Sequence, residues 1–80
     1  MYNLPLKEEL EEYLRRCEVY YLCELQNNNE HSANFYYTKI QECKNLLTLY
    51  NERKLYSNDW QEIKRIVEIN RMNRVMTNER

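Results

Sequence analysis

The six residues Asn27-Asn-Asn-Glu-His-Ser32 form a polar interruption between two long stretches of helical periodicity. Asparagine is the best replacement for glycine in the left-handed conformation that ends many helices, and this chain contains no glycine. Asn29 or Ser32 is suited to cap a helix that follows. The sequence therefore predicts that one helix ends at about residue 26 and that a second begins at about residue 33.

The stretches on either side each carry a stripe of mostly apolar side chains with a spacing of 4-3-4-3-4, which is one face of an α-helix. The first stripe is Leu6, Leu10, Tyr13, Cys17, Tyr20 and Glu24, and the second is Tyr36, Ile40, Cys43, Leu47, Tyr50 and Lys54. Folding the chain about a centre near Glu30 pairs the stripes, so Tyr13 is expected to contact Leu47 and Tyr20 to contact Ile40. This pairing predicts an antiparallel coiled-coil hairpin.

A second polar interruption, Tyr56-Ser-Asn-Asp59, precedes a third helix that we expect from about Asp59 to Met76. The apolar residues of its first half lie on one side, and those of its second half lie on roughly the opposite side. The first set is Trp60, Ile63, Ile66 and Val67, and the second is Ile69, Met72 and Met76. Because the apolar direction changes near Val67, either the helix breaks there or its end contacts a second body.

The predicted fold class is all-α, an antiparallel helical hairpin plus a third helix, with helices at about 5–26, 33–54 and 59–76. Residues 1–80 are expected to form a single helical domain, because 42% hydrophobic and 31% charged residues is an ordinary globular balance. We find neither a signal peptide nor an apolar run of membrane-spanning length. The expected location is therefore the cytoplasm, with no membrane contact.

The absence of glycine rules out several common catalytic and nucleotide-binding motifs. The phosphate-binding loops GxxxxGK[ST] and GxGxxG and the nucleophile elbow GxSxG all require it. The chain has one histidine, His31, so a HExxH zinc motif is also excluded, and His31 lies in the polar interruption. We therefore expect a protein that is not an enzyme and has no cofactor.

Metal binding was considered for the three cysteines together with His31. Cys17 and Cys23 are six residues apart on one helix, which separates them by about 9 Å along the axis and about 120° around it. Tetrahedral zinc requires all its ligands about 2.0–2.3 Å from one ion. We expect no metal, and interpret Cys17 and Cys43 as small core residues. A disulfide between those two would require Cα atoms within about 7 Å.

The charge is distributed unevenly along a chain whose formal net charge is −1. Residues 1–30 contain three basic and seven acidic side chains, and residues 63–80 contain five basic and two acidic ones. Such a basic helix either contacts phosphate groups or pairs with acidic residues of the same chain or of a dimer. The candidate phosphate contacts are Lys64, Arg65, Arg71 and Arg74, and the candidate acidic partners are Glu8, Glu9, Glu11 and Glu12.

Both flanks of the predicted hairpin carry apolar residues, and one further helix covers only one flank. One flank consists of Leu14, Tyr21, Leu25 and Tyr37, and the other of Val19, Cys23, Phe35, Leu46 and Leu49. Uncovered apolar surfaces often mark contacts with partners. The predicted protein interface is Val19, Cys23, Phe35, Leu46, Leu49, Ile69, Met72 and Met76.

The leading hypothesis is a small non-enzymatic protein–protein interaction module, acting as an inhibitor, an adaptor or an assembly subunit. It would bind a protein partner or form a homo-oligomer. The alternative is a small nucleic-acid-binding regulator that uses the basic C-terminal helix. Eleven asparagines, eight tyrosines and no glycine are typical of an AT-rich genome, such as that of a virus, a phage or a mobile element.

Overall fold

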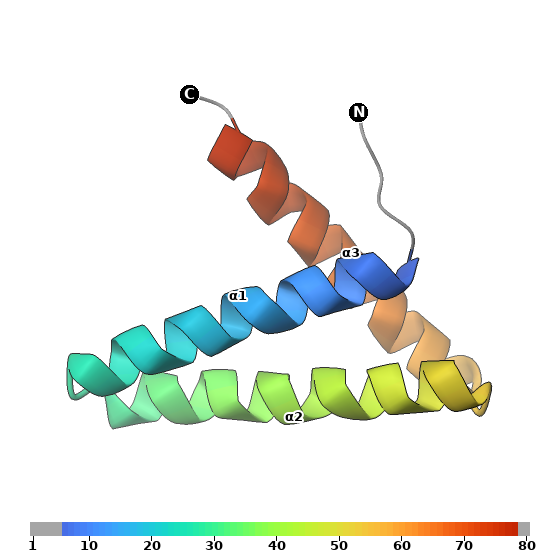
Figure 1. Ribbon diagram of the computed structural model, residues 1–80, viewed down its shortest axis with the longest axis horizontal. Coiled ribbons are helices and arrows are strands. Elements are labelled where there is room, and N and C mark those ends of the chain that lie inside the picture. The colour runs from blue at the N-terminus through green and yellow to red at the C-terminus, as the bar shows by residue number, and fades with distance from the viewer. Residues whose placement is uncertain (1–5, 79–80) are drawn as a thin grey trace.

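The structure, a computed structural model, describes residues 6–78, and for residues 75–78 it describes the backbone alone. It contains three helices in this range: α1 (Leu6–Gln26), α2 (Glu30–Glu52) and α3 (Ser57–Asn78) (Figure 1). The helices α1 and α2 lie antiparallel, and α3 crosses α1. The predicted all-α class, with a hairpin and a third helix, is confirmed.

The connection between α1 and α2 is shorter than predicted, because α2 begins at Glu30 and not at residue 33. Asn28 takes the left-handed conformation with φ of 60°, as expected for asparagine in a glycine-free chain. Asn29 precedes α2, but its side-chain Nδ2 donates to Glu24 Oε1 at 3.0 Å and does not cap the helix. The turn is therefore hydrogen-bonded to the end of α1, and α2 begins immediately after it.

The other two boundaries also differ from those predicted, at 52 for the end of α2 and 57 for the start of α3. Arg53 closes α2 in the left-handed conformation, with φ of 58°. Its N–H donates to Tyr50 O and that of Lys54 donates to Leu49 O, at 3.2 and 2.9 Å. In the first turn of α3, Asp59 Oδ2 accepts a hydrogen bond from the Tyr56 N–H at 3.0 Å, as in a capping box.

The predicted register of the hairpin is wrong by one helical turn. The connection is centred on Asn28, two residues before the predicted centre, and such a displacement moves facing residues by about one turn. The ring of Tyr20 packs against Tyr36, with centroids 5.3 Å apart, which is four positions before its predicted partner Ile40. A shift of one turn keeps the same faces together and changes only the partners.

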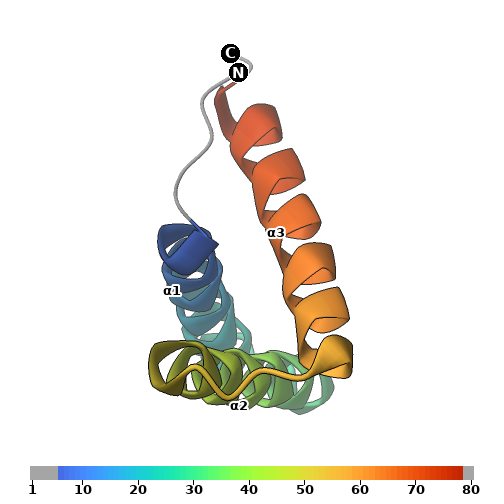
Figure 2. The same ribbon diagram turned by 90° about the vertical axis from the view of Figure 1, so that its right-hand side faces the viewer.

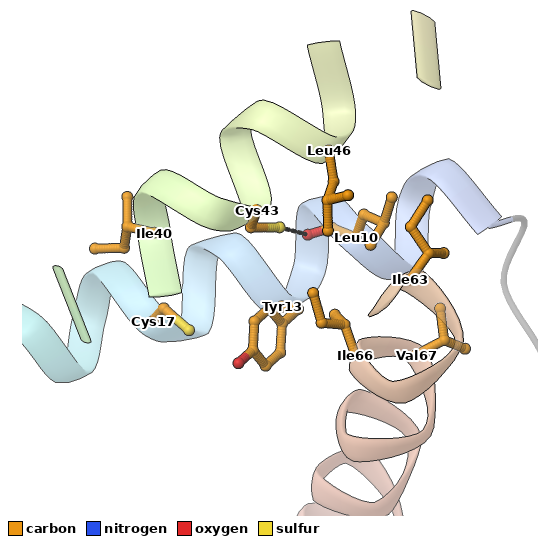
Figure 3. Packing of buried hydrophobic residues seen from close by; sticks show 9 residues of the cluster. All are labelled: Leu10, Tyr13, Cys17, Ile40, Cys43, Leu46, Ile63, Ile66 and Val67. Carbon is orange, nitrogen blue, oxygen red and sulfur yellow. Dashed lines mark hydrogen bonds between the residues drawn. The ribbon is translucent and has the colours of Figure 1, made fainter. Parts of the chain in front are cut away.

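The core lies where the three helices meet (Figure 3). It comprises Leu10, Tyr13, Cys17, Ile40, Cys43, Leu46, Ile63, Ile66 and Val67. Across the hairpin, Cys43 Sγ donates to Leu10 O at 3.2 Å. The residues from α3 are three of the four predicted; the fourth, Trp60, is 47% exposed and its ring lies 6.3 Å from that of Tyr50.

The helix α3 covers only part of the hairpin. It leaves the end of α2, rises past the N-terminal half of α1, and then extends away from the hairpin (Figures 1 and 2). We call residues 6–17 and 40–52 the base of the hairpin and residues 18–39 its turn end. Since α3 is continuous through Val67, the change in apolar direction does not reflect a broken helix.

Candidate functional site

The inward face of α3 becomes polar beyond Val67, and it meets two carboxylates of α1 there. Glu9, which is fully buried, accepts hydrogen bonds from Asn70 Nδ2 at 2.8 Å and from Arg71 Nε at 2.6 Å, and it is also paired with Arg74. Glu12 accepts from Asn70 Nδ2 at 2.8 Å and from Arg74 Nη2 at 3.1 Å. These five residues, Glu9, Glu12, Asn70, Arg71 and Arg74, are called the charged cluster below.

The charged cluster contains two carboxylates and two guanidinium groups, so its formal charges balance. Burial alone would raise the pKa of Glu9, but hydrogen bonds from Arg71 and Asn70 and the charge of Arg74 outweigh it and hold the pKa below its ordinary value. The pKa of Glu12 is lowered against burial in the same way, by hydrogen bonds from Asn70 and Arg74. Two ionised carboxylates saturated with donors are unsuited to proton transfer, so the cluster is a structural contact.

The charged cluster explains why the apolar residues of α3 change sides near Val67, because its polar residues occupy the inward face beyond that point. One of the two sequence-based readings of the basic helix was pairing with acidic residues of the same chain, and this pairing is present for Glu9 and Glu12. The other two candidates lie outside the cluster, since Glu8 is exposed and Glu11 is half-buried. A signal for this contact is present in the sequence: each helix carries its two like charges three residues apart, at positions 9 and 12 and at positions 71 and 74. Asn70 carried no such signal.

The four candidate phosphate contacts do not form one free positive surface. Arg71 and Arg74 belong to the charged cluster. Arg65 forms two hydrogen bonds with the carboxylate of Glu62, at 2.7 and 2.6 Å. Lys64 is exposed on another side of α3, beside a surface hollow that is also lined by Leu6 and Trp60. Three of the four charges are therefore matched by carboxylates of the same chain.

A groove with a volume of about 420 Å³ lies between the hairpin and α3. It is lined from α1 by Tyr13, Arg16, Cys17 and Tyr20, from α2 by Phe35, Tyr36, Lys39 and Glu42, and from α3 by Glu62, Arg65, Ile66, Ile69 and Asn73. Core residues thus form part of its lining, and exposed side chains border it.

Aromatic rings dominate the side of the groove at the turn end. The ring of Tyr36 lies 5.3 Å from Tyr20 on one side and 5.3 Å from Phe35, edge to face, on the other. Lys39 Nζ is 5.3 Å from the centre of the Phe35 ring. Phe35 nevertheless remains 55% exposed, and Ile69, from α3, is 41% exposed. Large apolar side chains from two helices therefore face water around one hollow.

The charges around the groove are matched with one exception. Lys39 lies 3.7 Å from Glu42, and Arg65 is paired with Glu62. Arg16 forms no ion pair with any residue in the range 6–78, and its Nε is buried without a hydrogen-bond acceptor. The charge of Arg16 contributes to lowering the pKa of Glu12, but its Nε donor lacks an acceptor beside the aromatic rings of the lining.

The predicted interface residues are divided by the structure into three groups. Val19, Cys23, Phe35, Ile69 and Met72 are exposed, and Leu49 is half-buried. The prediction for Leu46 is wrong, because this side chain is 4% exposed and belongs to the core. Its burial follows from the position of α3, which covers the base of this flank and leaves Phe35 beyond its reach. Met76 lies in the last turn of α3, outside the described side chains.

The three cysteines are free, and they differ in environment. Burial raises the pKa of the Cys43 thiol to about 12 and raises that of Cys17 as well. Cys23 is exposed at the turn end. Only Cys23 is therefore placed for reaction with reagents in water.

No further site of a familiar kind was found in the part of the chain that the structure describes. Among residues 6–78, no three side chains of His, Cys, Asp or Glu lie close enough to hold a metal ion. None of the three helices combines the length and the apolar character that crossing a bilayer requires. No protein-family model, no curated protein and no solved structure matches the chain.

Proposed function

We propose that the protein is a small non-enzymatic interaction module that binds another protein through the groove between the hairpin and α3. The observation that carries this proposal is the exposure of Phe35, Tyr20 and Ile69 around one hollow. Covering exposed apolar surface with a partner would stabilise the complex by a free energy of roughly 25 cal/mol for each Å² buried. A domain of this size has little stability in reserve, so a grouped set of exposed rings is better explained by binding than by folding.

The position of the groove supports the same proposal. The base of the hairpin is closed by α3 and holds the core, whereas the turn end is a two-helix layer with one face uncovered. A partner could therefore bind the turn end without disturbing the core. An inhibitor, an adaptor or an assembly subunit would each use such a surface.

The nucleic-acid alternative has less support, because it needs four basic residues and three of them pair with carboxylates. Replacing Arg71 and Arg74 by Glu is not a clean test of it, since this change would break the charged cluster. A gel-shift assay of the unaltered chain with DNA and RNA at low salt tests it directly, and a salt-sensitive shift would favour this alternative.

The experiment for the interaction proposal compares exposed apolar residues inside and outside the groove. Solution mass is measured by light scattering at micromolar concentration, for the chain alone and for the complexes that it forms in its source cell. Phe35→Asp and Ile69→Asp are expected to abolish association while helical circular dichroism is retained. The matched control is Leu22→Asp, which changes an exposed leucine that does not line the groove.

Two outcomes would contradict the proposal. One is a chain that is monomeric and forms no complex in its source cell. The other is a complex that Leu22→Asp weakens as much as Phe35→Asp does, since the contact would then lie elsewhere on the surface.

A further inference from the structure

The shape of the groove limits what it can hold. Residues of α1 and α2 line it on the hairpin side, and residues of α3 line it on the other. A groove between helices that has apolar residues in a partly polar lining is a setting in which proteins bind an amphipathic helix, through apolar residues spaced along one face of that helix. The exposed rings of Tyr20 and Phe35 and the side chain of Ile69 supply the apolar surface for such a helix.

Arg16 indicates the charge that a partner should carry. Its side chain lines the groove and also a second hollow of about 380 Å³, which is lined by Glu12, Arg15, Val19 and Tyr20 as well. Glu12, one turn before Arg16, is already held by Asn70 and Arg74. Arg16 itself forms no ion pair within the described residues, and a guanidinium with an unsatisfied donor beside an apolar surface is suited to bind a carboxylate by paired hydrogen bonds.

A second copy of this chain does not meet that requirement by symmetric contact. If two grooves faced each other across a twofold axis, the Arg16 side chains would approach one another, which like charges disfavour. The groove also offers no unpaired carboxylate of its own, because Glu42 and Glu62 are paired with Lys39 and Arg65. A symmetric groove-to-groove dimer therefore does not supply the acid, which favours a different protein as its source.

We infer that the groove receives an amphipathic helix of another protein, whose apolar face covers Phe35, Tyr20 and Ile69 and whose carboxylate binds Arg16. This inference rests on the proposed function and names the class of its partner. The bound helix would lie in the groove between the hairpin and α3, as the fourth helix of a bundle.

The inference is tested with a displayed library of a single amphipathic helix, randomised along one face and selected on the folded full chain. Enriched peptides are expected to share one Asp or Glu beside two or three large apolar residues. Replacing that acid by its amide should weaken binding about tenfold or more, as expected for a hydrogen bond to a charged group. In the Arg16→Gln chain, the same replacement should have no further effect.

Arg15→Gln is the matched control, because it makes the same change one position earlier at an exposed arginine that does not line the groove. Peptides that bind Arg16→Gln as well as the unaltered chain, or a library from which nothing is enriched, would overturn the inference. If such peptides still lose affinity for Phe35→Asp and Ile69→Asp, the proposed function stands without it. A homodimer dissociated by Phe35→Asp would likewise overturn the inference and retain the proposed function.

Discussion

The base of the hairpin and its turn end are built from the same two helices, yet they differ in what covers them. At the base, Ile63, Ile66 and Val67 of α3 pack on the hairpin. The charged cluster lies at the edge of this contact. At the turn end, aromatic rings pack against each other across α1 and α2 and remain partly in water. The comparison indicates that the base carries the stability of the domain, whereas the turn end retains apolar surface that folding does not use.

The largest expected effect is from Glu9→Gln, which removes the fully buried carboxylate from the charged cluster. Arg71 would then lose its carboxylate partner and Arg74 would keep only Glu12, and breaking a buried pair costs about 3–5 kcal/mol. Urea unfolding followed by circular dichroism measures this loss. The exposed neighbour Glu8→Gln is the control, with a change expected within about 0.5 kcal/mol. Equal effects of the two substitutions would show that the cluster does not hold α3.

A truncation in the core should be nearly as costly. Leu10 is fully buried at the meeting point of the three helices, so Leu10→Ala is expected to cost about 2–5 kcal/mol in free energy of unfolding. At the turn end, Leu25→Ala should cost much less, because Leu25 is exposed. If thermal unfolding ranked these two variants in the opposite order, the base would not be the stable region.

A pH dependence should follow from the charged cluster. The pKa values of Glu9 and Glu12 are lowered on folding from 4.5, so below that pH the unfolded chain binds more protons than the folded one. This contribution to stability is complete above pH 4.5 and is lost as the pH falls through the lowered pKa values. The urea midpoint should therefore be lower at pH 3 than at pH 7.

The control for this pH effect is again Glu9→Gln, whose dependence on acid should be shallower than that of the unaltered chain. A midpoint that fell as steeply in both proteins would place the titrating groups outside the cluster.

The smallest effect on stability is expected from Cys23→Ser, because Cys23 is exposed at the turn end. Its thiol should react with an alkylating reagent in the native protein, whereas Cys17 and Cys43 should react only on unfolding. The raised pKa of Cys43, about 12, strengthens its protection because the reactive thiolate does not form at ordinary pH. Mass spectrometry of the labelled protein counts the modified sites, and rapid labelling of all three would show that the base opens readily.

The helices and their antiparallel arrangement were predictable from the sequence, because both follow from local periodicity and from a polar turn. The register was not predictable, since it depends on where α2 begins. That helix begins at Glu30, directly after a turn in which Asn28 is left-handed and the Asn29 side chain bonds back to Glu24. A pattern of apolar residues contains no information on this bond, and an error of two residues in the turn moves every pair by one helical turn.

The charged cluster and the groove were only partly predictable, for two different reasons. Charged residues on a helix are ordinarily read as a solvated face, and the partners of Glu9 lie 61 to 65 positions away along the chain. The groove depends on the angle between α3 and the hairpin, which no periodicity specifies. Phe35 and Ile69 were therefore identified as exposed, whereas their common hollow and the part of Arg16 in it were not.

The long sequence separation within the charged cluster also bears on how the domain assembles. Contacts within the hairpin span a short connection and carry a small loop-closure cost, whereas joining Glu9 to Arg74 closes a loop of 65 residues. The hairpin is therefore expected to form before α3 docks, with Glu9 still in water at that stage. During synthesis, α3 could dock on the nascent hairpin only after residues 70–74 had left the ribosome. Over that interval the apolar surface of its base would be accessible to chaperones.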